Sequence, residues 1–102
     1  MKDFSGKLAV ITGGGTGIGR ALAKQLASEG CSVAMCDISE ADMEESCAFA
    51  MDGAPQGVRV TGFRADVAIE AQLNDFRDDT LERHETDHIH LLFNNAGIGG
   101  GG

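Results

Sequence analysis

Four short apolar runs recur along the chain and predict strands over residues 8–11, 32–36, 58–63 and 88–93. The first of them, Leu-Ala-Val-Ile, is continuously apolar and lies between a lysine and a run of glycines. Such runs are typical of strands that are buried on both faces of a parallel sheet.

The segment after the first run has apolar residues at helical spacing. Ile18, Leu22 and Leu26 lie four residues apart, and Gly30 follows where a helix would end. Glycine accepts the left-handed conformation that often terminates helices. This segment therefore predicts a helix that packs its apolar stripe on the sheet.

Two further helices are expected between the later strands. Ser39 is a candidate N-cap for the second, which ends in the glycine- and proline-containing segment 51–57. The third has a dense charged face, whose acidic residues we interpret as solvated. The expected core-facing residues are Met43, Cys47, Ala50, Ile69, Leu73, Phe76 and Leu81, with Met35 and Met51 as further core methionines.

Strands that alternate with helices through short connections favour a parallel sheet. The pattern predicts an α/β, Rossmann-type doubly wound fold in the order strand-helix-strand-helix-strand-helix-strand. We expect residues 1–102 to form one domain, truncated after its fourth strand.

A glycine-rich loop joins the first strand to the first helix. Residues 12–19 read Thr-Gly-Gly-Gly-Thr-Gly-Ile-Gly. Gly13 allows a tight turn, Gly17 lets the backbone approach a pyrophosphate, and Gly19 lets the helix pack closely. A P-loop is excluded because Arg20 and Ala21 stand where that motif has Lys and then Ser or Thr.

Asp37 ends the second strand about 20 residues after the loop, where an acidic residue accepts hydrogen bonds from an adenosine ribose. Its alternative roles are to cap the second helix or to be a solvated residue at a strand end. The 2′-phosphate of NADP would lie against this carboxylate. Positions 16 and 38 hold Thr16 and Ile38, so neither supplies a positive charge to offset the repulsion. At ~5 Å and an effective dielectric of ~20 the repulsion is about 3 kcal/mol per charge, which predicts a roughly 10- to 100-fold preference for NAD over NADP.

The amino-acid composition and charge limit the partners that the chain can bind. The chain is 42% hydrophobic and 24% charged with a net charge of −8, typical of a globular protein that repels nucleic acids and anionic membranes. It has no signal-peptide-like start and no apolar stretch of membrane-spanning length. We therefore expect a cytoplasmic protein.

The cysteines and histidines of the chain give no strong indication of a redox or metal site. The three cysteines lack Cys-x-x-Cys spacing and are interpreted as buried thiols. His88 and His90 lie two residues apart on a predicted strand and so share a face, which leaves a metal site as an alternative. We expect no metal there.

The motifs together resemble the amino-terminal half of a short-chain dehydrogenase/reductase. The resemblance rests on the glycine loop, Asp37, the Asp66-Val67 pair and Asn-Asn-Ala-Gly at residues 94–97, in that order. It implies that Asp66 and Val67 contact the adenine and that the segment 94–97 lines the cofactor. The alternative role of Asp66 is a helix cap. The expected cofactor-binding residues are Gly13, Thr16, Gly17, Ile18, Gly19, Asp37, Ile38, Asp66, Val67, Asn94, Ala96 and Gly97.

The resemblance also implies an activity that this chain does not complete. Family members are NAD(P)-dependent oxidoreductases that transfer hydride between nicotinamide and a small carbonyl or alcohol substrate, often as homo-oligomers. Their catalytic Ser, Tyr and Lys follow the Asn-Asn-Ala-Gly motif, so we expect them beyond Gly102, and this chain has no tyrosine. We expect a cofactor-binding fragment that is inactive alone. The alternatives are a non-catalytic dinucleotide-binding module or sensor, or a gene relic.

The family's sheet order, 3-2-1-4, adds a physical expectation. Ending the chain after the fourth strand leaves an apolar edge without a partner, and such edges favour aggregation. We expect the isolated chain to self-associate.

Overall fold

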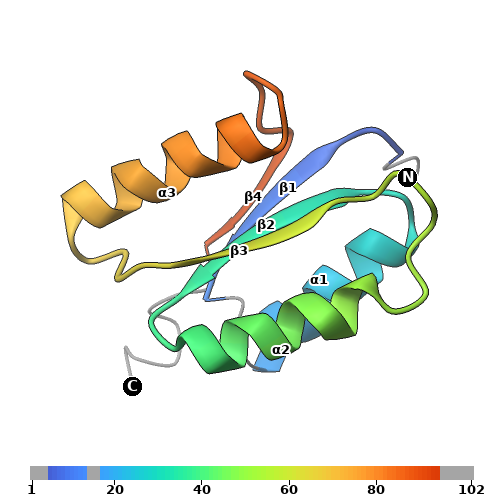
Figure 1. Cartoon of the computed structure of the whole chain (residues 1–102), viewed down its shortest axis with the longest axis horizontal. Helices are drawn as coiled ribbons and strands as arrows, with labels where there is room; N and C mark the ends of the chain where they lie inside the picture. The colour runs from blue at the N-terminus through green and yellow to red at the C-terminus, as the bar shows by residue number, and fades with distance from the viewer. Residues whose placement is uncertain (1–4, 14–16, 95–102) are drawn as a thin grey trace.

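A computed structural model describes residues 5–13 and 17–94 (Figure 1). It contains a four-stranded sheet and three helices. In chain order the elements are β1 (Leu8–Thr12), α1 (Gly17–Ser28), β2 (Ser32–Asp37), α2 (Glu40–Met51), β3 (Val60–Arg64), α3 (Glu70–Arg83) and β4 (Leu91–Asn94).

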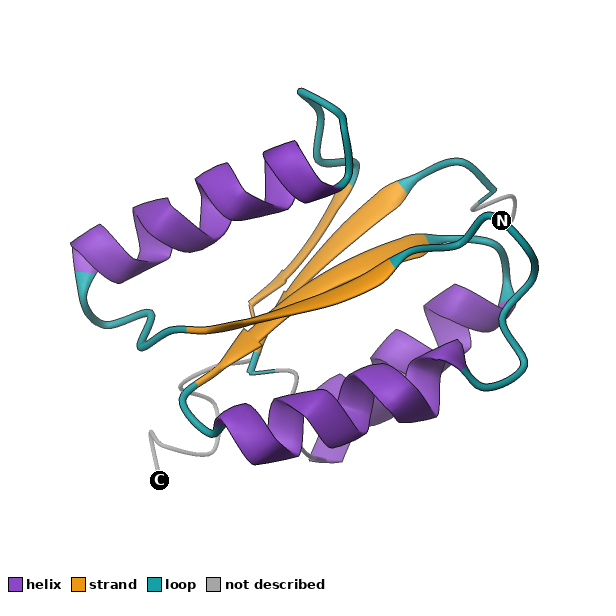
Figure 2. Ribbon diagram, viewed as in Figure 1, coloured by secondary structure: helices purple, strands orange, loops and turns teal. Residues whose placement is uncertain are grey.

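All strand pairings are parallel, in the order β3-β2-β1-β4. The helices form a layer on each side of the sheet: α1 and α2 lie on one face and α3 lies alone on the other (Figure 2). This arrangement confirms the predicted α/β doubly wound fold and its strand order.

The two central strands divide their side chains between two cores. Ile11 and Met35 belong to the cluster under α1 and α2, whereas Val10 and Cys36 belong to the cluster under α3. All five residues of β1 are buried. The prediction that the first apolar run is buried on both faces is therefore confirmed.

The helix ends follow the expected chemistry. Ser39 is the N-cap of α2, and its hydroxyl accepts a hydrogen bond from the Asp42 amide at 3.2 Å. Gly30 takes a φ of 92° just after α1, a conformation that costs little only for glycine. The thiol interpretation also holds, since Cys31 and Cys36 are buried, whereas Cys47 is only partly so.

Several expected core positions are wrong. Ile18 is 71% exposed in the first turn of α1, whereas Ala23 and Ala27 are buried. Met51 is exposed because it is the last residue of α2, where the helix ends. Periodicity in the sequence does not show which side of the first or last turn of a helix faces solvent.

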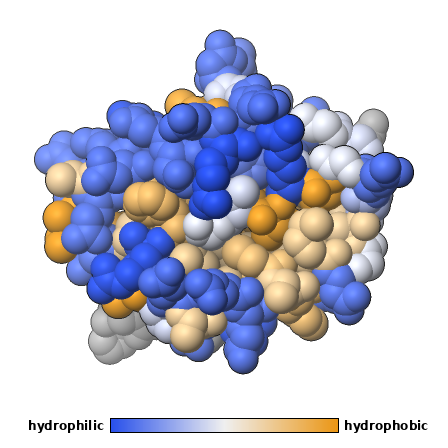
Figure 3. All heavy atoms as spheres, in the orientation of Figure 1, coloured by the Kyte–Doolittle hydropathy of each residue, from blue (hydrophilic) through white to orange (hydrophobic). Residues whose placement is uncertain are grey.

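The open side of α3 accounts for two further misplaced residues. Ile69 and Leu73 are exposed, whereas Phe76 is buried. Leu73 and Phe76 line an apolar hollow of about 220 Å³ that α3 forms with Ile89 and Leu92. The acidic residues of α3 face outward, as expected, and Figure 3 shows hydrophilic side chains covering this helix.

The fourth strand is shorter than predicted. It begins at Leu91, so residues 88–90 precede it and lie in the connection from α3. His90 is held there by two bonds to Leu8: its amide donates to the Leu8 carbonyl, and its Nδ1 accepts from the Leu8 amide at 3.1 Å. None of the helices in the described ranges is long and apolar enough to cross a membrane.

Candidate functional site

The carboxyl ends of the four strands lie along one edge of the sheet. Thr12 is in register with Cys36 on one side and with Asn94 on the other, and Asp37 is in register with Arg64. We call this the carboxyl edge: Thr12, Asp37, Arg64 and Asn94, together with Gly13, Ile38 and Ala65, which directly follow the first three. In doubly wound sheets ligands bind at such an edge.

The glycine loop leaves β1 at this edge. Gly13 has a φ of 75°, and its amide donates to the Cys36 carbonyl at 2.8 Å, which ties the start of the loop to the end of β2. Gly17 has a φ of 60° and opens α1. A Cβ on Gly17 would meet nothing within 4 Å, so the space beside it is open. Thr16 lies outside the described residues.

The start of α1 is suited to an anion. Its first amides have no intrahelical partner, and its first turn carries no acidic residue. Gly19 is buried, as expected of a glycine that lets the helix pack closely.

Arg20, in the first turn of α1, is turned toward α2. Its Nε donates to the Ser46 hydroxyl at 2.8 Å, and its Nη2 lies 3.1 Å from the Glu45 carboxylate. Arg20 therefore joins two helices, and a phosphate at this edge would depend chiefly on backbone amides.

Asp37 is half-buried at the end of β2. Its Oδ1 accepts from the Ser39 amide at 3.2 Å, and its carbonyl accepts from the Ala65 amide at 3.0 Å. Because Ser39 is the N-cap of α2, the alternative role of Asp37 as that helix cap is wrong. Its carboxylate is fixed by a local turn at the carboxyl edge.

Arg64 is the residue that sequence reasoning missed here. It is exposed and in register with Asp37 on the neighbouring strand. Registered residues of parallel strands project to the same face of a sheet, so Arg64 and Asp37 lie on one face of neighbouring strands. Only the pairing register reveals this neighbour, because Arg64 is 27 positions from Asp37 in the chain.

Asp66 and Val67 follow β3. The Asp66 carboxylate accepts from the Ala68 amide at 3.0 Å, and its own amide donates to Gln72 Oε1 at 2.8 Å. The N-cap of α3 is Ile69, so Asp66 stabilises its own turn and does not cap that helix. Val67 packs against the core under α3.

Asn94 closes the other side of the edge. Its Oδ1 accepts from the Thr12 hydroxyl at 2.9 Å, which links the ends of β1 and β4. Thr12 opens the motif at residues 12–19, and this bond to Asn94 is a role that sequence reasoning did not assign to it. Ala96 and Gly97 lie outside the described residues.

Two large apolar side chains are exposed at this edge. Ile18, in the first turn of α1, is 71% exposed, and Ile38, directly after Asp37, is 57% exposed. An open helix start, exposed apolar side chains and an oriented carboxylate fit the phosphates, rings and ribose of a dinucleotide. The described residues therefore fit the expected cofactor.

The cysteines near the sheet are not poised for nucleophilic chemistry. Burial raises the pKa of the Cys36 thiol to about 11, and it also raises the pKa values of Cys31 and Cys47. Thiols of this kind stay protonated at neutral pH.

The histidines lie at the opposite end of the sheet. The rings of His88 and His90 stack with centroids 6.3 Å apart, so they share a face as expected, although both precede β4. His88 Nδ1 bonds Asp87, and His90 Nδ1 bonds the Leu8 amide. Within residues 5–13 and 17–94 we find no group of three side chains able to hold a metal.

The fold and this edge define an α/β protein of the dinucleotide-binding, doubly wound class. The family model described as short chain dehydrogenase matches residues 7–102, and the chain belongs to that family.

Among curated relatives, levodione reductase of Leifsonia aquatica is 41% identical over 97 residues, which are 95% of this chain and 35% of that protein. A 2,5-dichloro-2,5-cyclohexadiene-1,4-diol dehydrogenase of Sphingobium indicum is 36% identical over 98 residues, 96% of this chain and 36% of that protein. The chain thus spans about a third of the length of these relatives.

Solved structures agree. Levodione reductase matches with a TM-score of 0.85 and 41% identity, covering 93% of this chain and 36% of that one. NAD⁺-bound xylitol dehydrogenase matches with a TM-score of 0.85 and 33% identity, covering 95% and 35%. A nicotinamide cofactor is therefore supported for the family fold present here.

Proposed function

We propose that residues 1–102 are the NAD-binding portion of a short-chain dehydrogenase that acts on a small carbonyl or alcohol substrate. One observation carries the proposal: the glycine turn, the Asp37 carboxylate and the Thr12–Asn94 pair lie along one edge of a parallel sheet. The nicotinamide would supply or accept the hydride.

In this proposal each part of the edge has its own task. The turn at Gly13 and Gly17 and the first amides of α1 bind the pyrophosphate, assisted by Thr16, Ile18 and Gly19. Asp37 accepts from the ribose, and Ile38, Asp66 and Val67 surround the adenine. Asn94, Ala96 and Gly97 line the path toward the nicotinamide.

We propose that NAD is preferred over NADP. Support comes from the Asp37 carboxylate, which a 2′-phosphate would approach. Arg64, in register with Asp37, weakens that repulsion, so we place the preference at the lower end of the roughly 10- to 100-fold range.

The reacting groups lie outside this sequence in our proposal. A complete protein would add the catalytic Ser, Tyr and Lys after Gly102, act in the cytoplasm and assemble as a homo-oligomer. The 102-residue chain would bind cofactor without turnover.

The test is a titration of the isotope-labelled 102-residue chain with NAD, followed by amide NMR. We expect saturable shifts at Gly13, Gly17 and Ile38 and unchanged signals in α3. Asp37→Asn should weaken binding about tenfold, the loss expected for a charge-assisted hydrogen bond.

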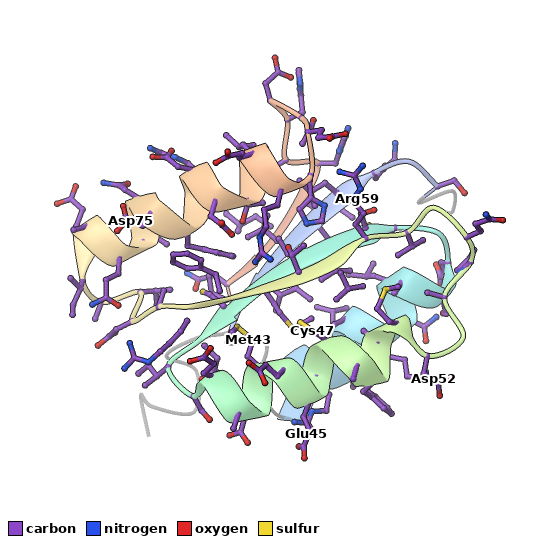
Figure 4. All side chains as sticks on the ribbon, viewed as in Figure 1. Met43, Glu45, Cys47, Asp52, Arg59 and Asp75 are labelled. Carbon is purple, nitrogen blue, oxygen red and sulfur yellow. The ribbon has the colours of Figure 1, made fainter. Side chains whose placement is uncertain are left out.

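The matched control is Asp75→Asn, which removes the same charge from the outer face of α3 (Figure 4). Equal losses in the two variants would show that net charge, not the carboxyl edge, governs binding. Shifts spread evenly over the chain would overturn the proposal.

A further inference from the structure

A second hollow, of about 240 Å³, opens at the amino ends of the strands, opposite the carboxyl edge. It lies between the starts of β1 and β2, the segment before β3 and the connection from α3 to β4. The side chains with polar groups that line it are those of Lys7, Ser32, Arg59, His84, Thr86 and His90. We call it the amino-end hollow.

The lining of this hollow is positive in a chain of net charge −8. Among the described residues that line it, Lys7 and Arg59 are cationic and none is acidic. Two carboxylates lie close by: Glu85 pairs with Arg59 at 3.1 Å and so offsets part of that charge, and Asp87 pairs with His88. Two of the chain's eight Lys and Arg residues thus line the amino-end hollow.

Several hydrogen-bond donors remain available there. His90 Nδ1 accepts from the Leu8 amide, so the neutral ring carries its proton on Nε2. The Ser32 hydroxyl accepts from the Arg59 amide at 3.0 Å and retains its own proton for donation. The Lys7 ammonium adds up to three donors.

Arg59 is held in a fixed position beside the hollow. Its Nη1 donates to the Arg83 carbonyl at 2.9 Å at the end of α3, and its Nη2 reaches Glu85. Figure 4 shows Arg59 near the end of α3, far from Met43 at the other end of the sheet. A guanidinium so placed keeps unused N–H groups for an anion.

The pKa of His84 reflects its burial and the charges beside the hollow. Its Nε2 lies 2.7 Å from the Thr61 hydroxyl. Burial and then the charges of Arg59 and Arg83 lower its pKa to about 4, although Asp79 acts in the opposite direction. Burial is the larger cause, and the two arginines add to it.

From the hollow, its two cations and its unused donors, we propose that the amino-end hollow binds a phosphate group, as free phosphate or as a small phosphomonoester. Lys7 and Arg59 supply positive charge, and the Ser32 hydroxyl and the His90 Nε2–H donate directed hydrogen bonds to the phosphate oxygens. Bound phosphate would also raise the pKa of His84, because a dianion offsets the charges of Arg59 and Arg83.

The experiment is an NMR titration of the 102-residue chain with inorganic phosphate at constant ionic strength, in the presence of saturating NAD. NAD keeps the glycine loop occupied, so phosphate there does not contribute. We expect saturable shifts of the His84 and His90 ring signals and a higher titration midpoint for His84. Lys7→Gln should weaken phosphate binding about tenfold.

Arg77→Gln is the matched control, because it removes one charge from the exposed face of α3. Its phosphate affinity should equal that of the unmodified chain. Glycerol 3-phosphate is the second probe. If it shifts the same signals as strongly, the hollow takes phosphomonoesters; if it binds more weakly, the hollow favours the free anion.

Three results would overturn the proposal. The first is that chloride at equal ionic strength reproduces the shifts. The second is that Lys7→Gln and Arg77→Gln lower the phosphate affinity equally, and the third is that the histidine signals fail to saturate. Because NAD binding is followed at Gly13 and Gly17 in the same spectra, failure of phosphate binding is distinguishable from failure of the cofactor proposal.

Discussion

At the scale of single residues, the neighbours across the sheet decide what each charged side chain does. Asp37 and Arg64 are far apart in sequence but in register on adjacent strands. An acidic and a basic residue therefore occupy neighbouring positions on one face of the sheet. Cofactor choice at this edge depends on the balance between them.

This pair makes a prediction for NADP. Asp37→Ala should strengthen NADP binding about tenfold, because the repulsion is lost while Arg64 remains to attract the 2′-phosphate. In the double variant Asp37→Ala, Arg64→Gln, most of that gain should disappear. Calorimetric titration with both nucleotides measures the effect. An equal gain in the single and double variants would exclude any role for Arg64.

His84 makes a prediction about pH. Its pKa is about 4 in the folded chain and 6.5 ordinarily, so between these values the unfolded chain binds more protons. Stability should therefore decrease as the pH falls from about 6.5 toward about 4. His84→Gln should flatten this decrease in urea unfolding at pH 7 and pH 5.

The control for this measurement is His88→Gln, because His88 is exposed and, among the described residues, hydrogen-bonds its close neighbours Asp87 and Thr86. It should keep the pH dependence of the unmodified chain. A flat profile in that control as well would assign the effect to other groups.

At the scale of elements, packing limits what the sequence alone predicts. The glycine loop, Asp37 and the Ser39 cap were predictable because each depends on a few adjacent residues and on one strand end. The exposure of Ile18 was not, because it depends on which side of the first turn of α1 the tertiary packing covers. The late start of β4 depends likewise on Leu8, which holds His90 in the preceding connection.

The contact between α2 and β3 is unusually close at Gly62. A Cβ there would lie 2.9 Å from Met43 Cγ and 3.0 Å from Cys47 Sγ. Figure 4 shows both side chains between α2 and the sheet. This closeness explains a glycine within a strand, where glycine otherwise weakens the structure.

Gly62→Ala should therefore destabilise the chain by about 1–3 kcal/mol, the usual cost of overpacking. Adding Met43→Ala should make room, so the double variant should lose less stability than the sum of the two single variants. Urea unfolding of all four proteins measures the coupling. Strict additivity would contradict the proposed contact.

At the scale of the whole molecule, one side of the sheet is covered less completely than the other. Two helices cover one face, whereas α3 alone covers the other (Figure 2). Leu92 on β4 is 67% exposed and borders the apolar hollow beside α3. Apolar surface next to a strand edge favours association between copies.

We therefore expect the 102-residue chain to self-associate, and Leu92→Lys to shift it toward the monomer. Sedimentation velocity over a range of concentrations measures both. Met51→Lys is the control, since Met51 is exposed at the end of α2, away from the open edge of β4. A monomeric unmodified chain, or an equal effect of both substitutions, would contradict the expectation.

The central place of β1 has a consequence for synthesis on the ribosome. Its outer neighbour β4 begins only at Leu91, and the Thr12–Asn94 bond joins residues 82 positions apart. At ribosomal speeds of about 5–20 residues per second, the chain between them takes on the order of 4–16 s to appear. During that time one side of the earliest strand is open to chaperones and to neighbouring nascent chains.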